Sequence, residues 1–104
     1  MATGSGKTIR VIVFQDSGMW VAQCLEYDIG AQAADIDTLR DRLEATLKAE
    51  FLESMARHKK PFAGIDPAPE RFHRMWDRRA HSVDFAPLPW VEQEKMKVDF
   101  GLAA

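Results

Sequence analysis

Short hydrophobic runs that are typical of β-strands occupy the first third of the chain. Thr8–Gln15 is rich in β-branched residues and apolar on both faces, which predicts a central strand. Met19–Leu25 and Ile29–Ala34 are similar runs. The polar loop Asp16–Gly18 contains a glycine, which accepts the positive φ of hairpin turns, so the first two strands should be antiparallel. We therefore expect a three-stranded antiparallel meander.

A helical pattern replaces the strand pattern after residue 37. Thr38–Asp41 has the spacing of a capping box, in which a threonine oxygen and a later acid satisfy free backbone N–H groups, so a helix is predicted to begin here. The pattern continues to Arg57 or His58. Three leucines at four-residue spacing form one stripe that can cover the sheet: Leu39, Leu43 and Leu47.

The remaining chain predicts one short helix and one strand. Residues 61–67 form a turn-rich connector, and Pro69 can take the first position of a helix that runs to Arg79. Two prolines should keep residues 85–90 extended. Residues 95–102 alternate between apolar and polar, and their polar side carries Lys95 and Lys97, which suits an edge strand.

These elements predict an α+β protein with the order βββααβ: a three-stranded antiparallel meander plus a C-terminal strand, one long helix packed on the sheet and a second short helix. The 104 residues suit a single domain, with a core at 7–58 and an extension at 59–104. Hydrophobic residues make up 46% and charged residues 29%, as in water-soluble globular proteins. Because no segment resembles a signal peptide or a membrane helix, we expect a cytoplasmic protein without a membrane partner.

The net charge of −2 hides an uneven distribution. Residues 57–81 carry seven Lys/Arg against three Asp/Glu, and the rest of the chain carries seven against thirteen. One side of the second helix, 69–79, combines arginines with aromatic neighbours and is a candidate contact for RNA or DNA phosphates. Glu70 and Asp77 dilute this charge, so a solvated helix face is the competing interpretation. The candidate nucleic-acid residues are Arg71, Arg74 and Arg78.

A second candidate surface is apolar. The leucine stripe rotates around its helix, so Phe51 and Met55 point away from the direction of Leu39 and need another cover. A later aromatic and proline-flanked segment supplies either that cover or a surface for a subunit or partner. The residues of this candidate interface are Phe51, Met55, Phe85, Leu88 and Trp90. Self-association into a homo-oligomer would bury them.

Two features of the sequence could indicate catalysis, a phosphate-loop-like motif and a group of carboxylates, but each also has a simpler structural interpretation. Gly4–Thr8 resembles the end of a phosphate-binding loop, but the first glycine of that motif would fall on Met1, and a strand follows instead of a helix. Four carboxylates surround the third strand, and a metal nuclease would use two of them, Glu26 and Asp28. Acids are also favoured in polar corners and before helices. The four are Glu26, Asp28, Asp35 and Asp37.

Histidine and cysteine give no stronger signal. His58, His73 and His81 lack the spacing of a local zinc site. Cys24 is the only cysteine and lies in an apolar run, so a buried and unreactive thiol is expected. The sequence predicts no catalytic residue, no cofactor and no metal site, and thus a protein that is not an enzyme.

Residues 10–47 resemble the HicB-like antitoxin family. The shared pattern is a strand, an acidic turn with Gly18, an aromatic residue at Trp20, two further strands, and a helix that opens with Thr38-Leu39. Val21, Gly30 and Leu43 also match the family pattern. The match covers a little over a third of the chain, and the segment after residue 60 is similar to a longer subgroup.

This resemblance implies a partial ribonuclease-H-like fold without an active site. It also implies a partner, because members of the family bind a small basic ribonuclease toxin, HicA, and cover its RNA-cleaving surface. The acidic first half of this chain suits a basic partner. No helix-turn-helix or ribbon-helix-helix segment follows residue 60, so repression through DNA is not expected.

Overall fold

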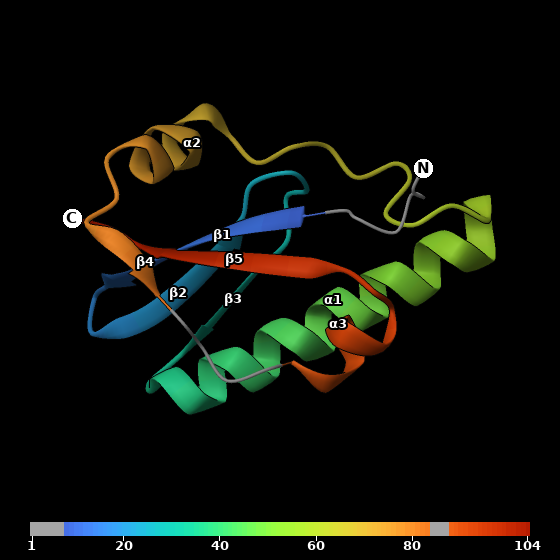
Figure 1. Ribbon diagram of the computed structural model, residues 1–104, viewed down its shortest axis with the longest axis horizontal. Coiled ribbons are helices and arrows are strands. Elements are labelled where there is room, and N and C mark those ends of the chain that lie inside the picture. Colours follow the sequence, from blue (N-terminus) through green and yellow to red (C-terminus); the bar gives the residue numbers. More distant parts are fainter. Residues whose placement is uncertain (1–7, 84–87) are drawn as a thin grey trace.

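A computed structural model describes residues 8–83 and 88–104, without the side chains of residues 81–83. The described elements are β1 (Thr8–Asp16), β2 (Met19–Cys24), β3 (Gly30–Ala33), α1 (Ile36–His58), α2 (Glu70–Asp77), β4 (His81–Val83), α3 (Pro89–Gln93) and β5 (Lys97–Leu102). The strands of these residues form one mixed sheet in the order β3-β2-β1-β5-β4. α1 and α3 lie on one face and α2 on the other (Figure 1). The α+β class and the long helix on the sheet are confirmed.

The predicted meander is present as β1, β2 and β3, with antiparallel pairing throughout. The turn between β1 and β2 is shorter than expected, because Asp16 still pairs with Met19. Ser17 and Gly18 have φ values of 54° and 81°, and this pair of positive φ angles is what a two-residue type I′ turn needs. The turn thus matches the twist of the flanking strands.

The final strand was wrongly predicted to lie at the sheet edge. β5 lies between β1 and β4 and pairs in parallel with β1, from Thr8 opposite Lys97 to Val13 opposite Leu102. β4 pairs antiparallel with the C-terminal half of β5. The lysine at position 97 is compatible with this interior place because β4 pairs only from Phe100 onward. The sheet is therefore mixed and larger than the predicted meander plus one strand.

The segment before β5 also differs from the prediction. Trp90 lies in the short helix α3 and not in an extended chain, because Pro89 takes the first helical position, where a missing N–H costs nothing. The Glu44 carboxylate of α1 accepts hydrogen bonds from the backbone N–H groups of Trp90 and Val91, at 2.8 and 3.3 Å. α1 thereby satisfies the free end of α3 and fixes it against the sheet.

α1 ends at His58, as predicted, but it begins earlier than the Thr38–Asp41 pattern indicated. Asp35 is the N-cap, and its carboxylate accepts hydrogen bonds from the backbone N–H and the hydroxyl of Thr38. The predicted cap, Thr38, therefore lies inside the first turn, where its hydroxyl donates to the capping carboxylate of Asp35. The predicted leucine stripe is confirmed, since Leu39, Leu43 and Leu47 are all fully buried.

The loop after α1 folds back onto the helix at Phe62. Its backbone N–H donates to the hydroxyl of Ser54, a buried polar residue of α1, at 2.7 Å. The Phe62 ring, 1% exposed, packs against Tyr27 and Phe51 with centroid distances of 4.6 and 5.8 Å. This contact seals the end of the core where α1 extends beyond the sheet (Figure 1).

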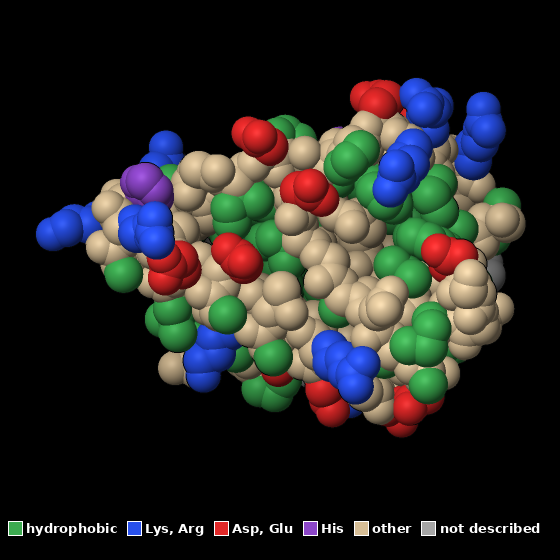
Figure 2. Space-filling model, turned by 180° about the vertical axis from the view of Figure 1, so that it is seen from behind, with side chains coloured by type: hydrophobic (Ala, Val, Ile, Leu, Met, Phe, Trp, Pro, Cys, Tyr) green, Lys and Arg blue, Asp and Glu red, His purple; other side chains and the backbone are tan. Residues whose placement is uncertain are grey.

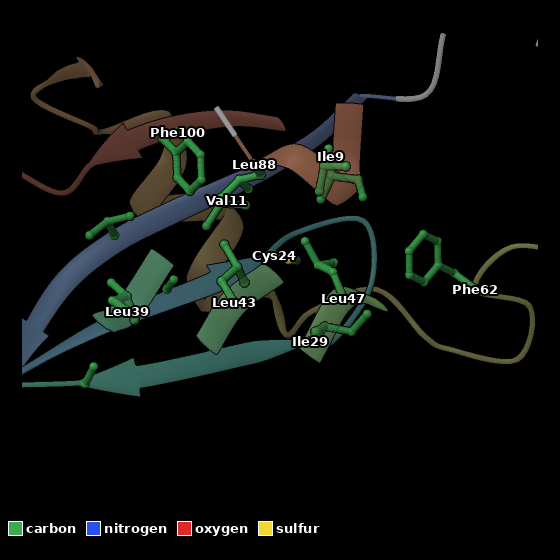
Figure 3. Close-up of a cluster of buried hydrophobic side chains, with 14 residues drawn as sticks. Ile9, Val11, Cys24, Ile29, Leu39, Leu43, Leu47, Phe62, Leu88 and Phe100 are labelled. Atoms are coloured by element: carbon green, nitrogen blue, oxygen red, sulfur yellow. The ribbon is translucent and has the colours of Figure 1, made fainter. Parts of the chain in front are cut away.

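The two faces of the sheet carry separate apolar clusters. The cluster under α1 contains the leucine stripe, the inward side chains of β1, β2 and β5, and Leu88 and Val91 near α3. Figure 3 shows Leu39, Leu43 and Leu47 directed at the strands. The cluster under α2 is smaller and consists of Ile12, Leu25, Ala68, Phe72 and Trp76. Among the described residues, no helix has the length and apolar composition to span a bilayer.

Candidate functional site

β3 is an edge strand, and half of its backbone groups face away from the sheet. The backbone N–H of Cys24 donates to the carbonyl of Ile29, which identifies the residues of β3 that bond to β2. Because this bonding alternates along an antiparallel pair, the N–H and C=O groups of Gly30 and Gln32 point outward. One of them is covered, since the Arg42 guanidinium donates to the carbonyl of Gln32 at 2.9 Å. Within residues 8–83 and 88–104, the other three have no hydrogen bond and can pair with an added strand.

Carboxylates lie at both ends of this edge. Asp28 precedes β3, and Asp35 and Asp37 follow it, and all three are exposed. The hydrogen bonds from Thr38, its backbone N–H first, lower the pKa of Asp35, so this group is charged over the whole neutral range. Edge backbone groups framed by negative charge favour a positively charged partner strand.

Three of the four acids that sequence analysis considered for a metal site, Glu26, Asp28 and Asp35, have separate structural partners. Glu26 forms an ion pair with Arg10 at 2.6 Å and also accepts from its backbone N–H. Asp28 accepts from the Gln23 side chain at 3.0 Å, and Asp35 caps α1. Within residues 8–83 and 88–104, no three His, Cys, Asp or Glu side chains gather in a way that could hold a metal ion. The leader at Gly4–Lys7 lies outside the described residues.

Cys24 is fully buried in the α1-side core, as the sequence predicted. Burial, with a smaller contribution from the nearby Glu26 carboxylate, raises the pKa of its thiol to about 12. The thiolate that would act as a nucleophile is therefore disfavoured at neutral pH. Of the histidines, His73 lies within 3.1 Å of the Ala68 carbonyl, His58 is exposed, and the side chain of His81 lies outside the described residues.

The basic side of α2 is exposed. Arg71, Arg74 and Arg78 point to solvent, and among the described residues none of them pairs with a carboxylate. Lys and Arg side chains gather at this end of the molecule, with hydrophobic side chains beside them (Figure 2). The three arginines fall on one side of the helix, as their spacing predicted.

Two further arginines near α2 were missed by sequence analysis. Arg79 stacks on the Trp76 ring at 4.2 Å, and Arg10 of β1 approaches the same ring at 5.9 Å. Trp76 can lie on β5 because Gly101 has no side chain there: a Cβ would stand 2.8 Å from the ring. Arg10, a charged residue within an apolar strand, was the one available signal of this cluster.

Only part of the candidate apolar interface stays at the surface. Leu88 is 5% exposed, and Trp90 packs edge-on against Phe51 at 5.2 Å, so these residues cover the rotated part of the leucine stripe. Met55 is exposed, and so is Leu52, a neighbour that sequence analysis did not single out. Phe85 lies outside the described residues. Self-association stays a prediction, and Met55 is a member of the predicted interface that the structure leaves exposed.

An open hollow lies at the hairpin end of the sheet. It has a volume of about 470 Å³ and is lined by Phe14, Gln15 and Trp20 of the hairpin, Met75 of α2, and Leu102 with the two alanines after it. Phe14 also stacks on Phe72 at 6.1 Å, which joins the floor of the hollow to α2. The hollow therefore borders the arginine side of α2.

Comparisons with protein-family models, with curated proteins and with solved structures give no match to this chain.

Proposed function

We propose that this chain is a non-catalytic interaction protein, an antitoxin similar to the HicB-like family, which binds a small ribonuclease toxin and masks its RNA-cleaving surface. The observation that carries the proposal is the β3 edge, with outward backbone groups at Gly30 and Gln32 and carboxylates at both ends. The fold, a meander followed by a long helix and a strand that returns beside β1, is compatible with the partial ribonuclease-H-like fold that the resemblance implies.

The chemistry of a ribonuclease explains why such an edge would suit it. A surface that holds RNA has to be positively charged, because every phosphate it contacts is negative. The carboxylates around β3 supply the complementary field, which speeds association and fixes orientation. Main-chain hydrogen bonds from an added strand then supply affinity, since β3 already presents its groups in extended geometry.

In the free chain, Arg42 partly blocks the β3 edge against pairing with other strands. Its bond to the Gln32 carbonyl occupies one of the acceptors that an added strand needs. Charged side chains of this kind prevent unspecific pairing between sheet edges. A partner strand whose backbone N–H donates to the Gln32 carbonyl would replace the guanidinium there.

The test blocks the edge without disturbing the fold. Gln32→Pro removes the outward N–H, and proline is tolerated on the free side of an edge strand because the pairing with β2 does not use that group. Gln32→Thr is the matched control, since it replaces the same side chain but keeps the N–H. The probe is the product of the open reading frame adjacent to the gene of this chain, which we expect to be a small basic ribonuclease.

RNA cleavage by that toxin is measured while each variant is titrated in, with circular dichroism as the check of folding. We expect the wild-type chain and Gln32→Thr to abolish cleavage near equimolar ratio, and Gln32→Pro to need at least about ten times more, the equivalent of 1.4 kcal/mol. Unchanged inhibition by a folded Gln32→Pro would contradict the use of β3. A toxin that no version of the chain inhibits would contradict the function itself.

A further inference from the structure

The arginine side of α2 and the hollow beside it form a second surface with a different chemistry from the β3 edge. Its charge is positive, and its depression is lined by aromatic and aliphatic side chains. We propose that this end of the molecule binds single-stranded nucleic acid, with Arg71, Arg74 and Arg78 on the phosphates and one base in the hollow. This activity goes beyond the proposed function and does not depend on it.

The arrangement of α2 places the arginines where a strand entering the hollow would run. Residues three and four apart lie on one side of a helix, so Arg71 and Arg78 flank Met75, which lines the hollow. Glu70 and Asp77 fall on the opposite flank of the arginine stripe. Met75, the α2 residue that lines the hollow, therefore lies on the side of the arginine stripe that faces away from Glu70 and Asp77.

The guanidinium groups of these arginines are also available to bind phosphates. The guanidinium of Arg71 packs on the Phe72 ring at 4.5 Å, which supports its position while its N–H groups stay in solvent. In the described residues, Arg71, Arg74 and Arg78 have no carboxylate partner that would have to be displaced. Arginine suits this task because its planar fork matches two phosphate oxygens.

The hollow favours a base over other groups. Phe14, Trp20 and Met75 provide flat or polarisable apolar surface, and Gln15 adds an exposed amide at the rim. Stacking on aromatic side chains next to a cationic track is how proteins hold unpaired strands, since every base has an apolar face. A base inside a duplex cannot reach such a depression, so the proposal is restricted to single strands.

The experiment measures fluorescence anisotropy of a labelled 12-nucleotide RNA of mixed sequence, of the same RNA as a duplex, and of a poly-glutamate peptide. The test variant is Arg71→Ala/Arg74→Ala/Arg78→Ala. The control is Lys48→Ala/Arg57→Ala/Lys60→Ala, which removes the same charge from exposed positions on and after α1. We expect the wild type to bind the single strand with a log–log salt slope of about −2 for three phosphate contacts. The test variant should lose binding, and the control should keep it.

Two rim variants test the hollow separately without touching the core. Gln15→Glu places a negative charge beside the base and should weaken binding about ten-fold, whereas Gln15→Ala should have little effect. Equal losses in both arginine and control variants, tighter binding of the duplex, or equal binding of poly-glutamate would each overturn the proposal. Salt-insensitive binding, or equal affinities of Gln15→Glu and Gln15→Ala, would also overturn it.

Discussion

The two faces of the sheet differ in how completely they are covered. On one face, the long helix α1, together with α3 and the Phe62 loop, excludes water from an apolar cluster in which the leucine stripe is fully buried. On the other face, the eight-residue helix α2 covers a smaller cluster and leaves arginines and an open hollow beside it. The difference teaches that the α1 face holds the fold together, while the α2 face and the β3 edge are free to carry surface chemistry.

The largest expected effect comes from opening the α1 face. Leu43→Ala should lower the free energy of unfolding by about 2–5 kcal/mol, because it leaves a cavity between α1 and the sheet. Leu52→Ala is the control on the same helix: Leu52 is 54% exposed, so its truncation should change stability by less than about 0.5 kcal/mol. Urea unfolding measures both. Equal losses would contradict the assignment of the α1 face as the main core.

The next effect concerns the loop that closes the α1 face. Ser54→Ala removes the acceptor of the Phe62 N–H, which is buried, and an unpaired buried donor costs about 1–3 kcal/mol. Thermal unfolding of this variant is compared with Ser17→Ala, whose hydroxyl is exposed on the hairpin. A Ser54→Ala chain as stable as Ser17→Ala would show that the loop does not rely on this bond.

On the α2 face, adding a side chain at Gly101 should lower the stability of the fold. Gly101→Ala would place a Cβ 2.8 Å from the Trp76 ring and 2.6 Å from the Arg79 side chain. The arginine can move aside but the ring cannot, so we expect a loss of about 1–3 kcal/mol and a shift in tryptophan emission. Adding Trp76→Leu to Gly101→Ala should return part of the stability lost. If Gly101→Ala changed neither the stability nor the tryptophan emission, the close packing of α2 on β5 would be contradicted.

The smallest effect is a pH dependence at the start of α1. The folded chain lowers the pKa of Asp35 below its ordinary value of 3.8, so this carboxylate stabilises the fold above that pH and stops doing so as the pH falls through its folded pKa. Asp35→Asn keeps a capping acceptor without the titration, and Asp35→Ala removes both. Melting curves between pH 7 and pH 2.5 should show a flatter acid limb for Asp35→Asn than for the wild type. Identical acid limbs would contradict the capping role.

Local patterns predicted the elements of the first half well. The hairpin follows from the Gly18 turn between two β-rich runs, and the helix follows from leucines at four-residue spacing. The helix start was predicted three residues too late, because the capping-box spacing at Thr38–Asp41 was taken as the cap and Asp35 was not considered for that role. Pro89 is a helix-start signal that the extended interpretation of residues 85–90 overlooked.

Long-range pairing was beyond the sequence patterns. β5 pairs in parallel with β1, although the two strands lie far apart in the sequence. Local sequence patterns do not indicate which distant strand a segment will pair with. The same limit applies to the surfaces. The spacing of Arg71, Arg74 and Arg78 predicted their common side, but the edge position of β3 and the approach of Arg10 to Trp76 depend on the assembled sheet.

The proposed antitoxin function requires that β3 is the sheet edge that pairs with the partner. Backbone amide hydrogen exchange of the chain, alone and bound to the ribonuclease that we expect the adjacent open reading frame to encode, tests this directly. We predict that the amides of Gly30 and Gln32 exchange rapidly in the free chain and become strongly protected in the complex. A complex that leaves both amides exchanging at the free rate, with protection confined to α2, would contradict it.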